Sequence, residues 1–488
     1  MKQGTGIVCL LMAAAGLLPA QPKPPEPLKL GSVVVQGSIR TRMEAWNWFD
    51  ADPADSSYAF SGTLLRLSFG QSRRSLDWQF ELAAPILLGL PDNSVAPGAA
   101  GLLGMGANYF TANGRNRNSA MVFPKQAYIR LKGLLGDDSR SLRVGRFEFL
   151  DGTEITPKNA TLAALKRDRM TQRLLGNFGW THVGRSFDGL HYVQNIGKAS
   201  LHVMGAIPTR GVFQTDGWGW VRTGFGYASL NGQHNGKRHS GDWRVFGLYY
   251  HDFRHGVLKT DNRAVAARLV DQANIRIPSF GGHYLHLVET SSGPVDVLLW
   301  GLAQTGNWGL QDHRAFAGQV EAGWQPKVWA KAKPWIRGGY LRATGDQNAG
   351  DGLHGTFFQA LPTPRPYARF PFFNFLNNED AFAELILRPS KKVTLRGDFH
   401  NLRLSSRSDL WYLGGGAFQP WSFGYIGRTS NGERGLGKLV DASVDYVLNA
   451  HVSLSFYGGY APGGKVAERI YPRGKNAGLG YVELTYKF

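Results

Sequence analysis

The last stretch of the chain, residues 478–488, reads GLGYVELTYKF. Val482, Leu484, Tyr486 and Phe488 fall on one face of this stretch, and polar or mixed residues lie between them. Side chains of a strand point alternately to its two faces, so the pattern predicts a strand with one apolar and one polar face. Such a strand can close a membrane barrel or end a soluble β-sandwich, and the rest of the chain must decide between the two.

The same two-residue alternation recurs along the whole chain. About 18 segments show it, at residues 33–46, 58–69, 76–83, 125–132, 141–147, 186–195, 198–206, 221–230, 242–252, 280–288, 295–304, 315–324, 333–343, 381–388, 392–402, 437–448, 452–460 and 478–488. Single-chain bacterial outer-membrane barrels have an even number of strands, and their closing strand resembles 478–488. Open sheet edges cannot exist in lipid. We therefore expect an all-β fold, a transmembrane antiparallel up-and-down β-barrel, formed by residues 32–488 as one domain.

The connections between these segments test the barrel hypothesis independently. They alternate in length: short ones at 70–75, 133–140, 196–197, 290–294, 389–391 and 449–451, and long ones at 48–57, 84–124, 148–185, 253–279, 344–380 and 403–436. Short periplasmic turns and long extracellular loops are typical of outer-membrane barrels, whereas a soluble sandwich has no reason to alternate. Both termini are then expected on the periplasmic side, and an interior of this width favours an aqueous channel.

The beginning of the chain predicts export. Residues 1–20 have a positive start, a short apolar core and a small-residue end, as in a secretory signal peptide. A Pro-rich lead-in follows at 21–31. The single cysteine, Cys9, lies in the signal, so the mature chain has no disulfide and no thiolate metal site. With no separate plug domain before the first strand, a TonB-gated receptor is disfavoured. We expect the protein in the outer membrane.

The net charge is +19 and the sequence pI is about 9.9. Without a DNA-binding motif in an exported chain, nucleic acid is not an expected partner. Two explanations remain for the charge: a positively charged lumen for anionic solutes, or basic loops that bind lipopolysaccharide phosphates.

The alternation also predicts which charges face the lumen. An arginine facing lipid at the bilayer midplane costs about 2–4 kcal/mol in such barrels, so charged residues of the strands should point inward. This applies to Arg40, Arg42, Glu44, Arg66, Arg130, Lys132 and Arg396. Each arginine can select anions, since its planar fork matches a carboxylate, or it can simply brace the wall in a salt bridge.

Three stretches together resemble the alginate export family of outer-membrane proteins. They are GSIRTRMEAW at 37–46, LRVGRFE at 142–148 with Gly152, and Trp180 with RSFDGL at 185–190. The resemblance implies an 18-stranded monomeric barrel with an electropositive pore, and an activity of outward diffusion of the polyuronate alginate. It also implies lumen positions for Arg40, Arg42, Glu44 and Arg146, and adds Arg143 and Arg185 to the expected anion pathway.

No pattern predicts an enzyme. A Gly-x-Ser-x-Gly elbow and a thiol nucleophile are both missing, and His182 with Ser186 is a pair that loops produce by chance. His234, His239, His251 and His255 cluster in the chain, but strand alternation scatters them, so we expect no metal and no cofactor. Residues 157–173 predict a short helix capped by Thr156, with basic residues at the outer mouth or against lipopolysaccharide. Residues 84–124 are a candidate for a loop that folds inward as a constriction.

These observations favour a passive channel for anionic solutes, with an anionic polysaccharide such as alginate among the candidates. The alternative is a barrel whose long loops bind a surface, as an adhesin does, without significant conductance. Expected partners are outer-membrane lipid and lipopolysaccharide, the anionic solute, and periplasmic secretion components. We expect a monomer. The identity of the solute and its direction of flow do not follow from the sequence.

Overall fold

The computed structural model describes residues 25–488. The expected signal peptide, 1–20, therefore lies outside the described residues. The expected lead-in does not end in irregular chain, because Leu28–Leu30 form a short strand, β1, that pairs antiparallel with the start of β2.

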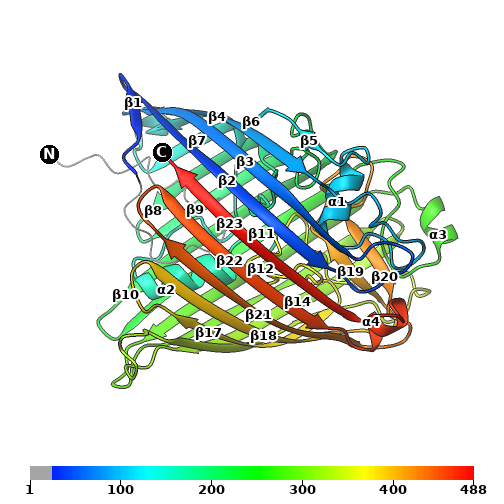
Figure 1. Cartoon of the computed structure of the whole chain (residues 1–488). Helices are drawn as coiled ribbons and strands as arrows, with labels where there is room; N and C mark the ends of the chain where they lie inside the picture. The colour runs from blue at the N-terminus through cyan, green and yellow to red at the C-terminus, as the bar shows by residue number, and fades with distance from the viewer. Residues whose placement is uncertain (1–24) are drawn as a thin grey trace.

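One large sheet closes on itself into a barrel (Figure 1). Its 21 strands include three short additions, β1, β5 (Ser119–Ala120) and β16 (Leu353–His354). The other eighteen form the wall: β2 (Val33–Asn47), β3 (Ser57–Ser72), β4 (Leu76–Leu88), β6 (Phe123–Lys132), β7 (Arg140–Phe147), β8 (Phe187–Ile196), β9 (Ala199–Pro208), β10 (Thr223–Asn235), β11 (His239–Asp252), β12 (Ile275–Val288), β13 (Val295–Trp308), β14 (Gln311–Trp324), β15 (Trp335–Ala343), β17 (Asn378–Leu387), β18 (Val393–Leu404), β21 (Gly435–Val447), β22 (Val452–Pro462) and β23 (Asn476–Lys487). Each of the eighteen expected segments overlaps one of them, which confirms the predicted fold.

The predicted terminal strand closes the ring. β23 pairs antiparallel with β2 from Ser38↔Lys487 to Asn47↔Gly478. Phe488 continues the pairing by one residue, since it exchanges two backbone hydrogen bonds of 3.0 Å with Gly37. The ring of Phe488 lies where a side chain on Gly37 would stand, so a larger residue at position 37 would displace this ring. Figure 1 shows β1, near the start of the described residues, and the C-terminus at the same end of the barrel.

The connections alternate in length as predicted, with one exception. Those at the end of the barrel that carries the termini are mostly short, such as Gly197 and Lys198 between β8 and β9, where Gly197 has a φ of 58° that glycine adopts without strain. Those at the opposite end are mostly long. The exception is β13–β14, joined at the long-loop end by Gly309 and Leu310 alone. We assign the short-turn end to the periplasm, as in other outer-membrane barrels.

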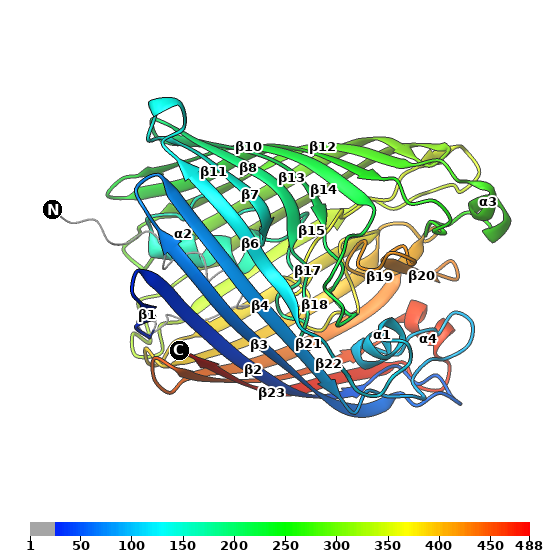
Figure 2. The ribbon, with the colours of Figure 1, turned by 90° about the horizontal axis from the view of Figure 1, so that it is seen from above.

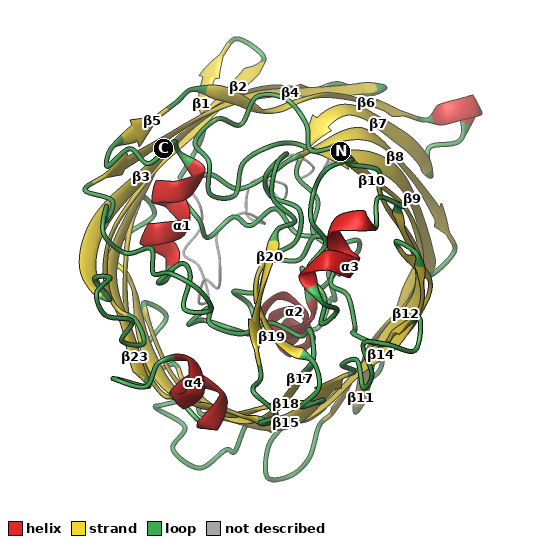
Figure 3. Cartoon of the chain, turned by 90° about the vertical axis from the view of Figure 1, so that its right-hand side faces the viewer, coloured by secondary structure: helices red, strands yellow, loops and turns green. Residues whose placement is uncertain are grey.

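The helices are short, and none of those in the described residues has the length and hydropathy to span a bilayer. They are α1 (Met105–Ala112), α2 (Ala160–Leu165), α3 (Val265–Val270), α4 (Lys465–Ile470), the 3₁₀ turn η2 (Leu134–Gly136) and the π-helical turn η3 (Lys166–Met170). A small hairpin, β19 (Leu410–Gly414) and β20 (Tyr425–Thr429), forms a separate two-stranded sheet. Figure 3 shows α2, β19 and β20 inside the ring of strands.

Long loops therefore fill much of the interior, which corrects the expectation of an open aqueous lumen. Loops 344–377 and 405–434 bury a dense set of rings, among them Phe357, Phe358, Phe370, Phe372, Phe373, Phe375, Trp411, Tyr412, Phe418 and Phe423. Loop 89–122 also packs inward, as predicted for 84–124, because Tyr109 of α1 is fully buried against Phe60 and Phe213.

Loop 148–186, hereafter the plug loop, reaches farthest. Figures 1 and 2 place α2 toward the end that carries the termini, although the loop enters from the other end. The Lys158 amide donates to Gln233, near the periplasmic end of β10, at 2.9 Å. The predicted helix at 157–173 is thus wrong in place and start: it lies inside the barrel, and Asn159 rather than Thr156 caps it.

Candidate functional site

The two faces of the wall differ as the alternation predicts. On β2 the side chains of Ile39 and Met43 are 38% and 62% exposed on the outer face, whereas Arg42 and Glu44 are buried on the inner face. Nine of the ten expected pathway residues lie on the inner side of the wall or among the loops within it, and Arg146 does not. Their position is thus described by the structure, while their role in transport remains a proposal.

Three of the expected residues, Arg40, Arg42 and Glu44, meet beside the closing seam. Arg42 lies 2.6 Å from Glu483 and 3.2 Å from Glu44, and its guanidinium stacks on the ring of Tyr481 at 4.8 Å. Arg40 donates to the backbone carbonyls of Gly179, at 2.7 Å, and Thr181 in the plug loop. Glu44 accepts from the Trp46 indole at 3.0 Å and lies 3.2 Å from the His182 ring. This cluster therefore joins β2, β23 and the plug loop.

A second group lies on β3, β4 and β6. Arg66 pairs with Glu81 at 2.5 Å and with Glu148 of the plug loop at 2.7 Å. Near the periplasmic end, Asp77 is shared by Arg130 and by Lys132, the latter at 2.7 Å. Each of these three cations therefore has a carboxylate at salt-bridge distance.

The other inward arginines have different surroundings. Arg396 lies 3.1 Å from Glu384 and 3.2 Å from Asp168 of η3. Arg143 contacts no carboxylate within 4 Å in the described residues; it stacks on Phe147 at 4.1 Å and lies 3.0 Å from the His191 ring. The sequence therefore predicted the face of these residues but not their partners.

Arg185, which the sequence places in the anion pathway, lies in the plug loop among the inward loops and not on a strand of the wall. Its side chain is fully buried and donates to the carbonyls of Pro362, Gly415 and Ala417, at 3.1, 2.8 and 3.5 Å. Burial lowers the pKa of Arg185 to about 10, which still leaves it charged at neutral pH. It fastens three inward loops to one another through backbone acceptors.

Arg146 faces outward, which corrects its predicted lumen position. It pairs with Ala127 and Asp188 in the sheet and shares the outer face with exposed Leu190. Its guanidinium donates two hydrogen bonds to the Asp188 carboxylate, of 2.7 and 2.8 Å, and the Trp220 indole also donates to that carboxylate. Arg143 and Arg146 are an odd number of residues apart, so strand geometry alone separates their faces.

The structure adds two arginines that the sequence did not single out, both in loop 344–377. The Arg365 guanidinium lies over the rings of Tyr457, Trp180 and Tyr481, with centroids at 4.7, 5.1 and 5.4 Å. It donates to the Tyr481 hydroxyl at 2.5 Å, and its Nη1 has no acceptor. Arg369 donates to Ser443 at 2.5 Å, and its Nε has no acceptor. Among the described residues, neither has a carboxylate within 4 Å.

Charge pairs also tie the plug loop to the opposite wall. Lys166 lies 2.8 Å from Asp242 of β11, and Arg169 lies 2.9 Å from Glu321 of β14. Arg244 of β11 reaches two plug-loop acids, Asp151 at 3.2 Å and Glu154 at 3.1 Å. Burial opposes ionisation of Glu154, but Arg244 and Lys166 outweigh it and lower its pKa to about 2. The loop is therefore held by charge on several sides.

Within residues 25–488, no group of three or more His, Cys, Asp or Glu residues is arranged to hold a metal ion. His234 and His239 do approach each other through His286, whose ring centroid lies 6.0 and 5.6 Å from theirs. The His251 ring instead lies edge-to-face with Phe253, with the ring centroids 5.3 Å apart.

Comparisons with solved structures agree on the architecture. OccK9 (OpdG) of Pseudomonas aeruginosa matches with a TM-score of 0.58 and 12% identity, over 93% of this chain and 98% of that one. OccK2 (OpdF) of the same organism, in complex with glucuronate, matches with 0.55 and 8%, over 93% and 98%. OccAB4 of Acinetobacter baumannii matches with 0.54 and 9%, over 94% and 98%. At these identities the likeness concerns the fold, an 18-stranded outer-membrane barrel.

A comparison with curated protein sequences gives no match. The sequence profile described as "Alginate export" matches residues 106–470. The matched range includes fourteen complete strands of the wall, from β6 to β22, the whole of loops 148–186, 344–377 and 405–434, and the second half of loop 89–122. Because the profile covers most of the chain, and the fold is that of an outer-membrane transport barrel, the chain belongs to the alginate export family.

Proposed function

We propose that the barrel is a passive channel for carboxylated anionic solutes, which bind at Arg365 and Arg369 on their way through the lumen. The observation that carries the proposal is the pair of loop guanidiniums without carboxylate partners. Most other inward cations are neutralised by acids at salt-bridge distance. Arg365 and Arg369 are held by rings and hydroxyls instead, and each retains a buried donor without an acceptor.

The surroundings suit a carboxylate of modest affinity. A guanidinium offers a planar fork that matches the two oxygens of a carboxylate. Trp180, Tyr457 and Tyr481 around Arg365 present apolar faces beside the charge, as ligand sites commonly do. Wall acids nearby, such as Asp441 and Glu483, limit the net positive charge. Conduction needs binding weak enough for release. Arginines with acids close by can provide such weak, reversible binding of a carboxylate.

The size of the solute is the finer part of the proposal. OccK2 is described in complex with glucuronate, which carries a carboxylate. In this chain the plug loop crosses the lumen, so a single sugar acid needs less space than a polymer. We infer that uronic acids or short oligomers pass in the observed arrangement, and that an alginate chain requires movement of the plug loop.

Single-channel current in a planar bilayer tests this proposal. In a salt gradient we expect a reversal potential that indicates anion preference, and partial block by added glucuronate. The double variant Arg365→Gln/Arg369→Gln should lose the block and most of the preference. Arg314→Gln, an exposed outer-wall change on β14, is the matched control and should change neither. A current without ion preference, or one indifferent to the double variant, would contradict the proposed site; a silent barrel would contradict the channel.

One observation favours the alternative of a surface-binding barrel. Helix α3, at the extracellular end (Figure 1), exposes Val265, Leu269 and Val270 by 54%, 57% and 75%. The large loops otherwise fold inward, which leaves α3 as a small apolar projection. Replacement of Leu269 and Val270 by Ser should leave conductance unchanged and abolish any surface adhesion.

A further inference from the structure

We propose that the outer wall at the extracellular ends of β15, β17, β18 and β21 binds a phosphorylated glycolipid of the outer leaflet. The site combines a basic patch, made of Arg342, Arg403, Arg434 and Lys438, with an apolar groove below it. The two parts match the two ends of a lipid A-type molecule, which carries phosphates on a sugar headgroup and acyl chains beneath. The inference concerns the outer face and does not depend on the proposed solute.

The patch is exposed and carries an excess of positive charge. Arg342 pairs in the sheet with Glu379, and Glu379 pairs with Arg403 on its other side. Neighbouring strands lie about 4.8 Å apart, so the two arginines flank this one carboxylate at close range. Glu379 is 2.8 Å from Arg434 and 3.7 Å from Arg342. One acid thus faces several cations.

Arg403 and Lys438 are the members available to a ligand. Both side chains are exposed on the outer face, next to lipid-facing Phe399 and Val440. In the described part of the chain neither forms a hydrogen bond or a salt bridge. An uncompensated pair of cations at a membrane surface is suited to phosphate oxygens, which accept strong charge-assisted hydrogen bonds.

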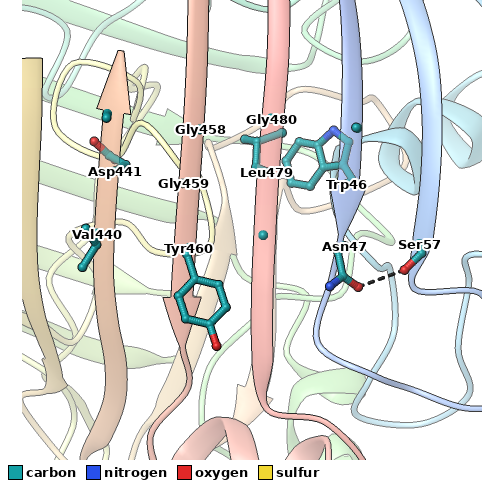
Figure 4. Close-up of a pocket in the computed structure, with 13 residues that line it drawn as sticks. Trp46, Asn47, Ser57, Val440, Asp441, Gly458, Gly459, Tyr460, Leu479 and Gly480 are labelled. Atoms are coloured by element: carbon teal, nitrogen blue, oxygen red, sulfur yellow. Dashed lines mark hydrogen bonds between the residues drawn. The ribbon is translucent and has the colours of Figure 1, made fainter. Parts of the chain in front are cut away.

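The groove begins directly beneath the patch. Small residues face outward in one row across six strands: Gly397, Ala442, Gly458, Gly480, Ala45 and Ala59, each the sheet partner of the next. The four central residues of this row, Ala442, Gly458, Gly480 and Ala45, line a hollow of about 550 Å³ on the outer wall. Val440 and Tyr460 lie at its side (Figure 4). Asn47 and Ser57, joined by a 2.9 Å hydrogen bond, mark its polar edge.

The spacing of the two parts fits one lipid. Ala442 follows Lys438 by four residues on the same face of β21, which is about 13 Å along a strand. The apolar hollow therefore lies one to two sheet rows below the cation patch, toward the centre of the membrane. A single lipid can place its headgroup on the patch and its acyl chains in the hollow. Charge complementarity selects a phosphorylated lipid over a second copy of this basic chain, whose own patch would be repelled.

Native mass spectrometry of the purified barrel tests the site with diphosphoryl lipid A as the probe. We expect wild type to retain lipid A, and Arg403→Gln/Lys438→Gln to bind at least tenfold more weakly. The same lipid without its phosphates should bind wild type as weakly as that variant binds the probe. Lys237→Gln/Arg238→Gln, which removes two exposed cations at the periplasmic turn after β10, is the control and should bind normally.

A groove variant separates the two halves of the site. Gly458→Leu fills the hollow, and no atom lies within 4 Å of the added Cβ, so the barrel should still fold. It should weaken lipid A binding while monophosphate binding at the patch persists. Equal retention of lipid A by wild type and by both site variants would overturn the proposal. A wild-type dimer that carries no lipid and that Gly458→Leu disrupts would also overturn the proposal. The groove would then be the contact surface for a second copy of the chain.

Discussion

Two sets of loops fill this barrel, and they are held by different forces. The plug loop, 148–186, is fixed by charge pairs to the wall, through residues such as Lys166, Arg169 and Asp168. Loops 344–377 and 405–434 are fixed mainly by packed aromatic rings, in edge-to-face pairs such as Phe370 with Phe372 and Trp411 with Phe49. Rings hold loop 344–377, and among residues 25–488 no carboxylate lies within 4 Å of Arg365 or Arg369; under the proposed function these two cations are the ones that a solute meets.

The largest expected effect comes from removing a tether of the plug loop. Arg244→Gln should lower the free energy of unfolding by about 3–5 kcal/mol, because it leaves Asp151 and Glu154 buried without their cation. Denaturant titration in detergent measures the loss, and hydrogen exchange should show faster exchange in 148–186. Arg314→Gln on the outer wall should leave both unchanged. Normal protection of the plug loop in Arg244→Gln would show that charge does not hold it.

Acid should loosen the plug loop through His182. Burial lowers the pKa of His182 to about 4, below the ordinary value near 6.5, although its hydrogen bond to Glu44 opposes the shift. A lowered folded pKa means that the stabilisation is complete above about 6.5 and is lost as pH falls toward 4. Between pH 7 and pH 5 the loss should be about 2 kcal/mol.

Hydrogen exchange of residues 148–186 at the two pH values measures this effect. In the variant His182→Gln the plug loop should exchange at a rate that no longer depends on pH in this range, apart from the intrinsic chemistry of exchange. If wild type and variant respond alike, another group controls the loop.

Acid should act oppositely, and more weakly, on loop 405–434. Asp409 is buried and accepts hydrogen bonds from Thr356 at 2.6 Å and Tyr412 at 2.7 Å. Burial outweighs these hydrogen bonds and raises its pKa to about 6. The folded loop then binds a proton more tightly than the unfolded chain, so its stability increases as pH falls from 7 to 5, by about 1 kcal/mol. In Asp409→Asn, protection of 405–434 should no longer rise with acid; a rise that persists would exclude Asp409.

The sequence predicted the wall well and the interior poorly, for a physical reason. Each strand has one face toward lipid and the other toward the barrel interior. Apolar and polar residues therefore alternate along it, as exposed Met43 next to buried Arg42 shows. The loops have no such periodic pattern. The sequence of 370–375 therefore does not indicate whether its phenylalanines pack inside the barrel or are exposed. Arg365 and Arg369 were missed because their segment was interpreted as an extracellular loop. The outward position of Arg146, by contrast, was available from its odd spacing to Arg143.

Arg146 gives the smallest expected effect and the sharpest contrast with the interior. Arg146→Gln should not change the reversal potential, because its side chain lies on the outer wall with Asp188 and Trp220. The free energy of unfolding should fall by only about 1 kcal/mol, as for a partly exposed ion pair. Arg66→Gln is the matched inner-wall change and should cost about 3–5 kcal/mol, since Glu81 and Glu148 lose a shared buried cation. A change in anion preference in Arg146→Gln would mean that the outer face contributes to selectivity, and that an inward position is not what separates conducting from structural arginines.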